Sequence, residues 1–157
     1  MNIIFLDIDG VLNYQNVPKS EKVVRPYGEV SIKCVALLNK LTSESKAKIV
    51  VSSTWRKDGT QYGTIGERLL DMGVTGEVID STPDIHAPSS FRGNEIYEWI
   101  RDNDDLLGCK HCDYKDYVIL DDDSDMLLWQ ANNFIEVDRW TGITPHTVFK
   151  AKKILGI

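Results

Sequence analysis

The sequence predicts an α/β sandwich with a mainly parallel sheet, and three observations lead to this prediction. Short apolar segments rich in Ile and Val recur along the chain, as expected of strands that are covered on both faces. Segments with a helical spacing of apolar residues lie between them, and such alternation is typical of a sheet covered by helices. The 157 residues, of which 42% are hydrophobic and 27% charged, are enough for one domain over 1–157 that folds without a metal or a disulfide.

Five strands are expected in chain order. Four of them are apolar runs with little polar alternation, and they cover Ile3–Asp7, Lys48–Ser52, Tyr117–Asp121 and Phe134–Asp138. A weaker run covers Gly76–Asp80. Their length and composition favour buried parallel strands.

Helices are expected where apolar residues recur at spacings of three, four and seven. The first pattern consists of Val30, Cys34, Leu37, Leu38 and Leu41, which fall on one face of a helix. The later ones are shorter, and they cover Ile65–Met72, a helix over Gly93–Asp102 that carries Ile96, Trp99 and Ile100, and Val148–Leu155.

Composition excludes several classes of protein. The formal charge of -6 argues against a general nucleic-acid coat protein, which would have a basic excess. The longest apolar run, Cys34–Leu38, is five residues long, so no transmembrane helix is expected. The apolar start, Ile3–Leu6, is too short for the core of a signal peptide. Three cysteines then indicate reduced thiols, and we expect a cytoplasmic protein.

Polar clusters follow three of the expected strands. They are Asp7-Ile8-Asp9-Gly10, Ser52-Ser53-Thr54-Trp55-Arg56 and Asp121-Asp122-Asp123-Ser124-Asp125. In an open parallel sheet, ligands bind in the crevice beyond the carboxyl ends of the strands. The three clusters are therefore expected to converge there.

These residue types suit phosphoryl transfer. Asp7 can attack a phosphoryl group, and Asp9 can protonate the leaving oxygen and then activate water. Several carboxylates in one crevice repel each other unless a cation lies among them, and Mg²⁺ prefers such oxygen ligands. Ser52 can hydrogen-bond a phosphoryl oxygen, while Arg92 can neutralise its charge.

The motifs FLDIDGVLN, IVVSSTWR, FRGNEI and YVILDDDSD, in this order, resemble those of the haloacid dehalogenase (HAD) superfamily of phosphatases. The likeness is closest to the small HAD domain of Swiss Army Knife RNA-repair proteins, and the later VDRWTGIT belongs to it. This resemblance implies a three-layer Rossmann-like HAD fold with five mainly parallel strands in the order 3-2-1-4-5. It also implies a Mg²⁺-dependent phosphomonoester hydrolase that acts through an aspartyl-phosphate.

The resemblance assigns roles to individual residues. Asp7 matches the nucleophile, Asp9 the general acid/base, and Ser52 the hydroxyl residue after the second strand. The superfamily usually has a lysine in its third motif, where this sequence has Arg92 ahead of a helix. Arg92 supplies charge and a bidentate fork, and Arg56 is its rival for the same role.

The expected metal ligands come from the first and last motifs. The resemblance makes Asp7 and Asp121 ligands through their carboxylates and Asp9 a ligand through its backbone carbonyl. Either Asp122 or Asp125 occupies the supporting acidic position.

Residues next to the second motif are candidates for binding the substrate. Trp55 and Arg56, as an exposed aromatic ring and a cation, would hold a base or another planar group. The alternative for Trp55 is a ring packed beneath a loop. Ser53 would replace Ser52 if the motif is shifted by one residue, and Trp140 and Tyr14 are further aromatic candidates that are less well placed.

The spacing of the motifs leaves no room for a substantial cap domain. Residues 13–28 suffice for a loop, and the 35 residues between Arg56 and Arg92 are largely used by a helix and a strand. An open crevice admits the end of a polymer, so we expect nucleotides or phosphorylated nucleic-acid ends as substrates. A basic rim is expected from five side chains, Lys19, Lys22, Arg25, Arg56 and Lys57.

Three alternatives remain at this point. Another phosphotransfer enzyme would use the same aspartyl-phosphate with a different outcome. A non-catalytic domain that binds phosphorylated ligands or proteins would have the same fold, although such a domain usually loses the nucleophile or the acid. Cys109, His111 and Cys112 suggest half of a zinc site, against the simpler interpretation of a loop before the fourth strand.

Overall fold

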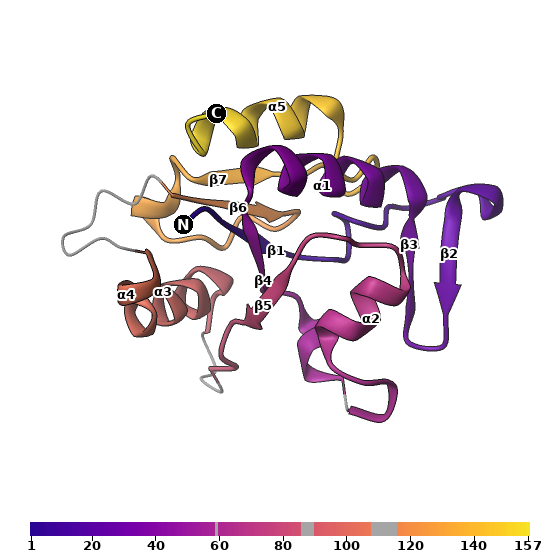
Figure 1. The fold of residues 1–157 in the computed structure, drawn as a ribbon, viewed down its shortest axis with the longest axis horizontal. Helices are drawn as coiled ribbons and strands as arrows, with labels where there is room; N and C mark the ends of the chain where they lie inside the picture. Colours follow the sequence, from indigo (N-terminus) through magenta and orange to yellow (C-terminus); the bar gives the residue numbers. More distant parts are fainter. Residues whose placement is uncertain (59, 86–89, 108–115) are drawn as a thin grey trace.

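The main sheet of the protein contains five parallel strands in the order β5-β4-β1-β6-β7 (Figure 1). The computed structural model describes residues 1–58, 60–85, 90–107 and 116–157. Numbered within this sheet alone, the order is 3-2-1-4-5, which confirms the predicted topology. The strands are β1 (Ile3–Leu6), β4 (Lys48–Val51), β5 (Val78–Ser81), β6 (Tyr117–Asp121) and β7 (Phe134–Glu136).

Alternate side chains of the strands enter two different cores. Ile4 and Leu6 point into the larger core, whereas Ile3 and Phe5 point into the smaller one, because successive side chains of a strand face opposite sides. The larger core lies under three helices, α1 (Ile32–Ser45), α2 (Ile65–Asp71) and α5 (Pro145–Ile154). The smaller core is covered by α3 (Arg92–Asp102), which is followed by the short α4 (Asp104–Leu107) (Figure 1). The protein therefore has the predicted three layers.

The elements match the expected ones with small shifts at their ends. β1 and β4 end one residue early, so Asp7 and Ser52 lie just beyond the strands. The helix expected from Val30 begins at Ile32, because Ser31 caps it by accepting a hydrogen bond from the backbone N–H of Cys34.

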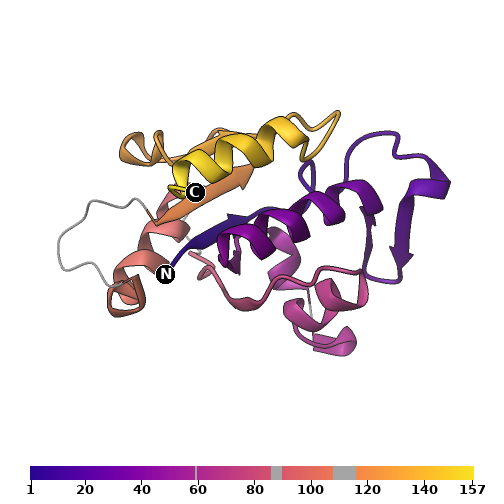
Figure 2. The same ribbon diagram turned by 45° about the horizontal axis from the view of Figure 1, so that its top comes forward.

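A β-hairpin occupies the segment that was expected to be only a loop. It consists of β2 (Lys22–Arg25) and β3 (Gly28–Ser31), which pair antiparallel and stand at one end of the molecule (Figure 2). Arg25 Nε and the Tyr27 hydroxyl both donate to Asp71, so the hairpin is attached to the end of α2. Within the described ranges, this hairpin is the largest insertion between the first two motifs, and no cap domain is found.

Two further expectations concern the membrane and zinc. Among the helices of the described ranges, none combines the length and the apolar character needed to cross a bilayer. Cys109, His111 and Cys112, the candidates for half of a zinc site, lie outside the described residues.

Candidate active site

The three polar clusters meet at the carboxyl edge of the sheet, as expected. Asp7 directly follows β1, and Asp121 ends the neighbouring β6. Between Asp7 and the next helix the chain turns at Gly10, whose φ of +76° is in the left-handed region. A Cβ atom at Gly10 would lie 2.5 Å from Cγ of Asp122. Glycine is therefore what lets the first loop pass close to the Asp122 carboxylate.

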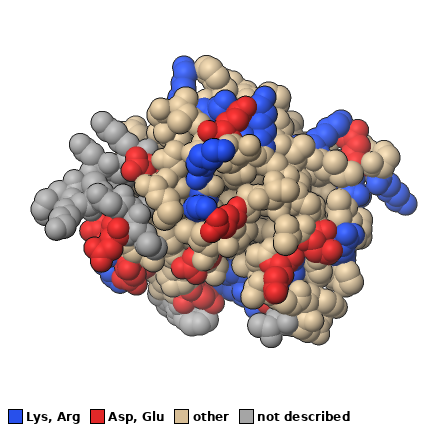
Figure 3. Space-filling model, in the orientation of Figure 1, with Lys and Arg blue, Asp and Glu red and all other residues tan. Residues whose placement is uncertain are grey.

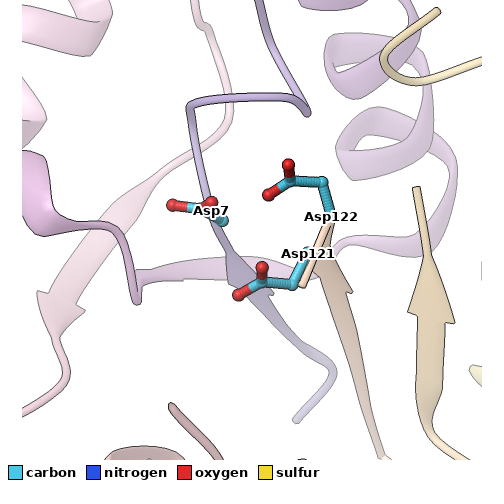
Figure 4. Close-up of side chains that lie close together, drawn as sticks. All are labelled: Asp7, Asp121 and Asp122. Carbon is cyan, nitrogen blue, oxygen red and sulfur yellow. The ribbon is translucent and has the colours of Figure 1, made fainter. Parts of the chain in front are cut away.

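Three carboxylates form one group beyond β1 and β6. Asp7, Asp121 and Asp122 each contribute an oxygen, and these oxygens all lie within 4.8 Å of one another. Figure 4 shows the three side chains converging, one from β1 and two from the end of β6. Asp7 and Asp121 are buried, and Asp122 is half-buried. We call these three residues the carboxylate group.

Burial and mutual repulsion disfavour the charged forms of the carboxylate group. Burial raises the pKa of Asp7, an effect that the nearby positive charge of Arg92 partly offsets. The pKa of Asp121 is raised to about 7, first by burial and then by the negative charge of Asp7. Burial also raises the pKa of Asp122. A cation among the three carboxylates would remove this penalty.

The buried polar atoms at this edge fit a metal ion. Within the described ranges, Oδ2 of Asp121 and Oγ of Ser52 are buried and make no hydrogen bond. Buried oxygens without partners are costly, and a donor set made of carboxylate oxygens is the one that Mg²⁺ and similar hard cations prefer. The carboxylate group can therefore bind a divalent metal.

Asp9 lies beside the carboxylate group but in a different environment. Its side chain is exposed, and each carboxylate oxygen accepts one hydrogen bond: Oδ2 from Trp55 Nε1 at 2.9 Å and Oδ1 from Asn13 Nδ2 at 2.8 Å. Asn13 is itself fixed, because its Oδ1 accepts from the Gly10 N–H. Asn13, which follows Asp9 by four residues in the first motif, is therefore a site residue that was not expected from the sequence.

The two candidate arginines are held differently. Nε of Arg92 lies 3.4 Å from Oδ2 of Asp121, beside the carboxylate group. The backbone N–H of Arg92 donates to Oδ2 of Asp125 at 2.9 Å. This hydrogen bond holds the start of α3 near the end of β6. Asp125 therefore anchors the helix that carries Arg92, while Asp122 is the residue that joins Asp7 and Asp121 in the carboxylate group.

Arg56 is a buried structural residue by its contacts. Its guanidinium donates to the backbone carbonyls of Ser52, Ser53 and Thr82, and it forms a 2.8 Å ion pair with Glu95. The side chains of this pair are 4% and 8% exposed. Arg56 thus ties the loop after β4 to the following segments and to α3, and its donors are engaged within the protein.

The exposed stacking surface expected at Trp55 is not found. Trp55 is 8% exposed, and its ring packs against Gly28 of the hairpin, where a Cβ atom would lie 2.1 Å from the ring. The ring therefore lies under the β2–β3 hairpin, as in the alternative interpretation, with its N–H directed at Asp9. Ser53 is also buried, and its hydroxyl hydrogen-bonds Asp7, which partly lowers the pKa of that carboxyl.

The expected basic rim is largely neutralised by ion pairs. Lys22 pairs with Glu29, Arg25 with Asp71 and Lys57 with Asp84, in addition to the pair of Arg56. In three of these four pairs, those of Arg25, Lys57 and Arg56, the acidic partner is distant along the chain. On the face drawn in Figure 3, basic and acidic side chains likewise lie interspersed.

Arg139 is a second residue near the carboxylate group that sequence reasoning missed. Its Nε lies 3.2 Å from Oδ2 of Asp122, and its side chain is 53% exposed. Arg139 follows the β7 strand, whose carboxyl end points to the same edge of the sheet as that of β6. The signal in the sequence was its place in VDRWTGIT, shortly after the last strand.

Comparison with known proteins gives one match. The model of the family described as "HAD domain in Swiss Army Knife RNA repair proteins" matches residues 3–148. No curated protein and no solved structure matches the chain significantly. The matched range contains all elements of the sheet, the carboxylate group, Asp9 and Arg92.

Proposed function

Because the chain belongs to the family of HAD domains found in Swiss Army Knife RNA repair proteins, we propose that it is a Mg²⁺-dependent phosphomonoester hydrolase. One observation supports this proposal most: a group of three carboxylates, two of them buried and one half-buried, lies at the carboxyl edge of a parallel sheet next to an exposed, hydrogen-bonded fourth carboxylate. The carboxylate group provides the nucleophile and the metal ligands, and the fourth carboxylate, that of Asp9, provides the general acid and base.

Asp7 is the nucleophile in this proposal. An oxygen of its carboxylate attacks phosphorus, the bond to the ester oxygen breaks, and an aspartyl-phosphate forms. The position directly after β1 is fixed on both sides by strand pairing with β4 and β6. Asp7 therefore has little freedom to move away from a bound phosphoryl group, and such positioning lowers the entropic part of the barrier.

Asp9 carries the proton in both halves of the reaction. It gives a proton to the leaving ester oxygen, and as a carboxylate it then takes a proton from the water that attacks the aspartyl-phosphate. The second attack releases inorganic phosphate and restores Asp7. Trp55 and Asn13 hold one carboxylate oxygen each, and every oxygen keeps a further lone pair for the proton.

Charge on the phosphoryl oxygens is balanced by the surrounding residues. Asp7, Asp121, Asp122 and the backbone carbonyl of Asp9 would hold Mg²⁺, which when bound neutralises negative charge on the nucleophile and the phosphoryl group. Arg92, next to Asp121, provides a fixed positive charge for the same oxygens. The buried hydroxyl of Ser52, which has no hydrogen-bond partner in the described ranges, donates to one of them.

We further propose phosphorylated nucleic-acid ends or nucleotides as the substrates. The family description connects its HAD domains with RNA repair, and a terminal phosphate on a nucleic-acid strand is a phosphomonoester. The described residues contain a hairpin and no cap domain between the first two motifs, and this absence of a cap supports access of a polymer end to the carboxyl edge. Long-range attraction by a basic rim contributes little, because in the described part of the chain four of its five cations, all except Lys19, are paired with acids.

The test is phosphate release from a panel of substrates. The panel contains 3′- and 5′-phosphorylated oligonucleotides, nucleoside monophosphates, sugar phosphates and a nitrophenyl phosphate, each measured with Mg²⁺ and with a chelator. We expect Mg²⁺-dependent release, with the highest kcat/KM for a nucleic-acid end or a nucleotide. Binding without turnover would instead favour the non-catalytic phospho-ligand domain, and a higher kcat/KM for a sugar phosphate would refute the proposed substrate class.

A further inference from the structure

A cavity of about 410 Å³ adjoins the carboxylate group on the side of β7. Its volume is within the range of small-molecule sites, which is about 300–1,000 Å³. The cavity shares Asp122 with the carboxylate group, so a ligand in it would lie directly beside a phosphoryl group bound at Asp7. The remaining lining residues are consecutive, Glu136, Val137, Asp138, Arg139 and Trp140.

Trp140 is exposed at the edge of this cavity because a well-formed turn holds it there. Its side chain is 59% exposed. Its backbone N–H donates to Oδ1 of Asp138 at 2.9 Å, and the N–H of Gly142 donates to the Asp138 carbonyl at 2.8 Å. The next residue, Ile143, donates to the carbonyl of Val11 at 3.0 Å. The turn is thereby attached to the loop that follows Asp7 and Asp9.

The lining of the cavity fits a nucleoside better than a phosphate. An exposed indole offers a flat surface on which any base can stack. The exposed carboxylates of Glu136 and Asp138 accept hydrogen bonds from base amino groups and ribose hydroxyls, and they repel additional phosphates. Arg139, which lines this acidic cavity, pairs with Asp122 of the carboxylate group.

We propose that this cavity binds the nucleoside of the phosphorylated terminal nucleotide, with its base stacked on Trp140. The inference rests on the proposed function, since it takes the phosphate of that nucleotide to lie at Asp7. It adds a binding site for the nucleoside and a residue that would determine specificity. Trp140 provides the ring on which the base stacks, because Trp55 is buried and hydrogen-bonded to Asp9. Sugar phosphates without a base lack this contact.

The experiment compares two substrates that differ only in the base. One is a short oligonucleotide with a terminal phosphate on an intact nucleotide, and the other is the same oligonucleotide with that terminal base removed. For the unmodified protein we expect kcat/KM to be about tenfold higher with the base, the effect of one stacked base. In Trp140→Ala this preference should disappear, and Trp140→Phe should restore most of it.

A matched control is available in Trp129, which is 60% exposed and lies in η4 (Leu128–Gln130), in a different cavity beside Tyr97. Trp129→Ala should retain the preference for the intact nucleotide. A preference that survives in Trp140→Ala, or that is lost in Trp129→Ala instead, would overturn the proposed nucleoside site. Turnover of both substrates with no preference in the unmodified protein would do the same while leaving the phosphatase proposal intact.

Binding can be tested without turnover in Asp7→Asn protein. Stacking of a base on Trp140 should quench part of the fluorescence of the four tryptophans when a nucleoside monophosphate is added with Mg²⁺. The same titration of Asp7→Asn/Trp140→Phe should lack this part, and glycerol phosphate should not produce it. An unchanged quench in the double variant would contradict the inference even if the protein hydrolyses no phosphate ester.

Discussion

The loop after β4 and the carboxylate group lie at the same edge of the sheet, yet their charges are balanced in opposite ways. In the loop, the guanidinium of Arg56 is buried, bonded to backbone carbonyls and paired with Glu95. In the carboxylate group, burial and repulsion raise the pKa values of Asp7 and Asp121, and Oδ2 of Asp121 makes no hydrogen bond within the described ranges. Both segments are polar clusters in the sequence. The carboxylate group is therefore a candidate active site because its negative charges are only partly balanced within the protein. The loop after β4 is structural because the charge of Arg56 is balanced by Glu95.

The largest expected effect is on the nucleophile. Asp7→Asn keeps the size of the side chain but removes the attacking carboxylate, so kcat should fall by about four powers of ten or more. Asp102→Asn, an exposed acid at the end of α3, is the matched control and should retain full activity. Phosphate release measures both variants, and substantial turnover by purified Asp7→Asn would contradict the covalent mechanism.

The contrast between the two arginines predicts a separation of activity from stability. Arg92→Ala should lower kcat/KM by about 10²–10³-fold, the effect of removing one preorganised positive donor. Arg56→Ala leaves the buried Glu95 with only the longer 3.5 Å contact to Arg92 and should lower the free energy of unfolding by about 3 kcal/mol. Kinetics and urea unfolding of the two variants test this. If Arg56→Ala is as stable as the unmodified protein while its activity is lost, the assignment of the two arginines is wrong.

The hydrogen bond from Trp55 to Asp9 should have a smaller effect that depends on the leaving group. Trp55→Phe removes the indole N–H, so we expect kcat/KM to fall about tenfold for an alkyl phosphate, which needs the proton from Asp9. The fall should be smaller for a nitrophenyl phosphate, whose leaving group needs no proton.

A second buried tryptophan provides the control for this variant. Trp99 Nε1 donates to Oδ2 of Asp80 at 2.7 Å, away from the carboxylate group. Trp99→Phe removes a hydrogen bond of the same kind and should change the two kcat/KM values by the same factor. An equal loss on both substrates in Trp55→Phe would show that Trp55 acts only through packing.

A further expected effect is on stability rather than on activity, namely its dependence on pH and Mg²⁺. Because the pKa of Asp121 is raised in the folded state, from 3.8 to about 7, its protonation stabilises the metal-free protein. This contribution, on the order of a few kcal/mol, is fully present below pH 3.8 and is lost as the pH rises through about 7.

Thermal unfolding with and without Mg²⁺ measures this effect. Mg²⁺ should raise the Tm more at pH 8 than at pH 5, because protons compete for the same oxygens. Asp121→Asn should reduce both the pH dependence and the response to Mg²⁺. A Tm that is insensitive to Mg²⁺ at pH 8 would refute the metal site.

Much of the fold follows from local patterns in the sequence. Parallel strands buried on both faces are continuous apolar runs, so Ile3–Leu6 and Tyr117–Asp121 were identified within a residue of their observed ends. The convergence of Asp7 with Asp121 follows as well, because both residues stand at the carboxyl ends of adjacent parallel strands.

The parts that escaped prediction depend on contacts between distant segments. The hairpin around Gly28 is short and half-exposed, and its strands alternate too briefly to be recognised. Arg25 lies 46 residues from its partner Asp71, and Arg56 reaches Glu95 on a different element. Residue type alone therefore did not indicate which cations are free for a substrate. The burial of Trp55 has the same origin, since Gly28 leaves space for its ring.

The most direct test of the central claim is to trap the phosphoryl group on Asp7. In Asp9→Asn protein with Mg²⁺, a nitrophenyl phosphate should still react with Asp7, whereas hydrolysis of the aspartyl-phosphate should be slow because the base is missing. After quenching in acid, peptide mass spectrometry should find the phosphoryl group on Asp7 and on no other residue. Release of phosphate by this protein without any phosphoryl label at Asp7, or a label at another residue, would contradict the account.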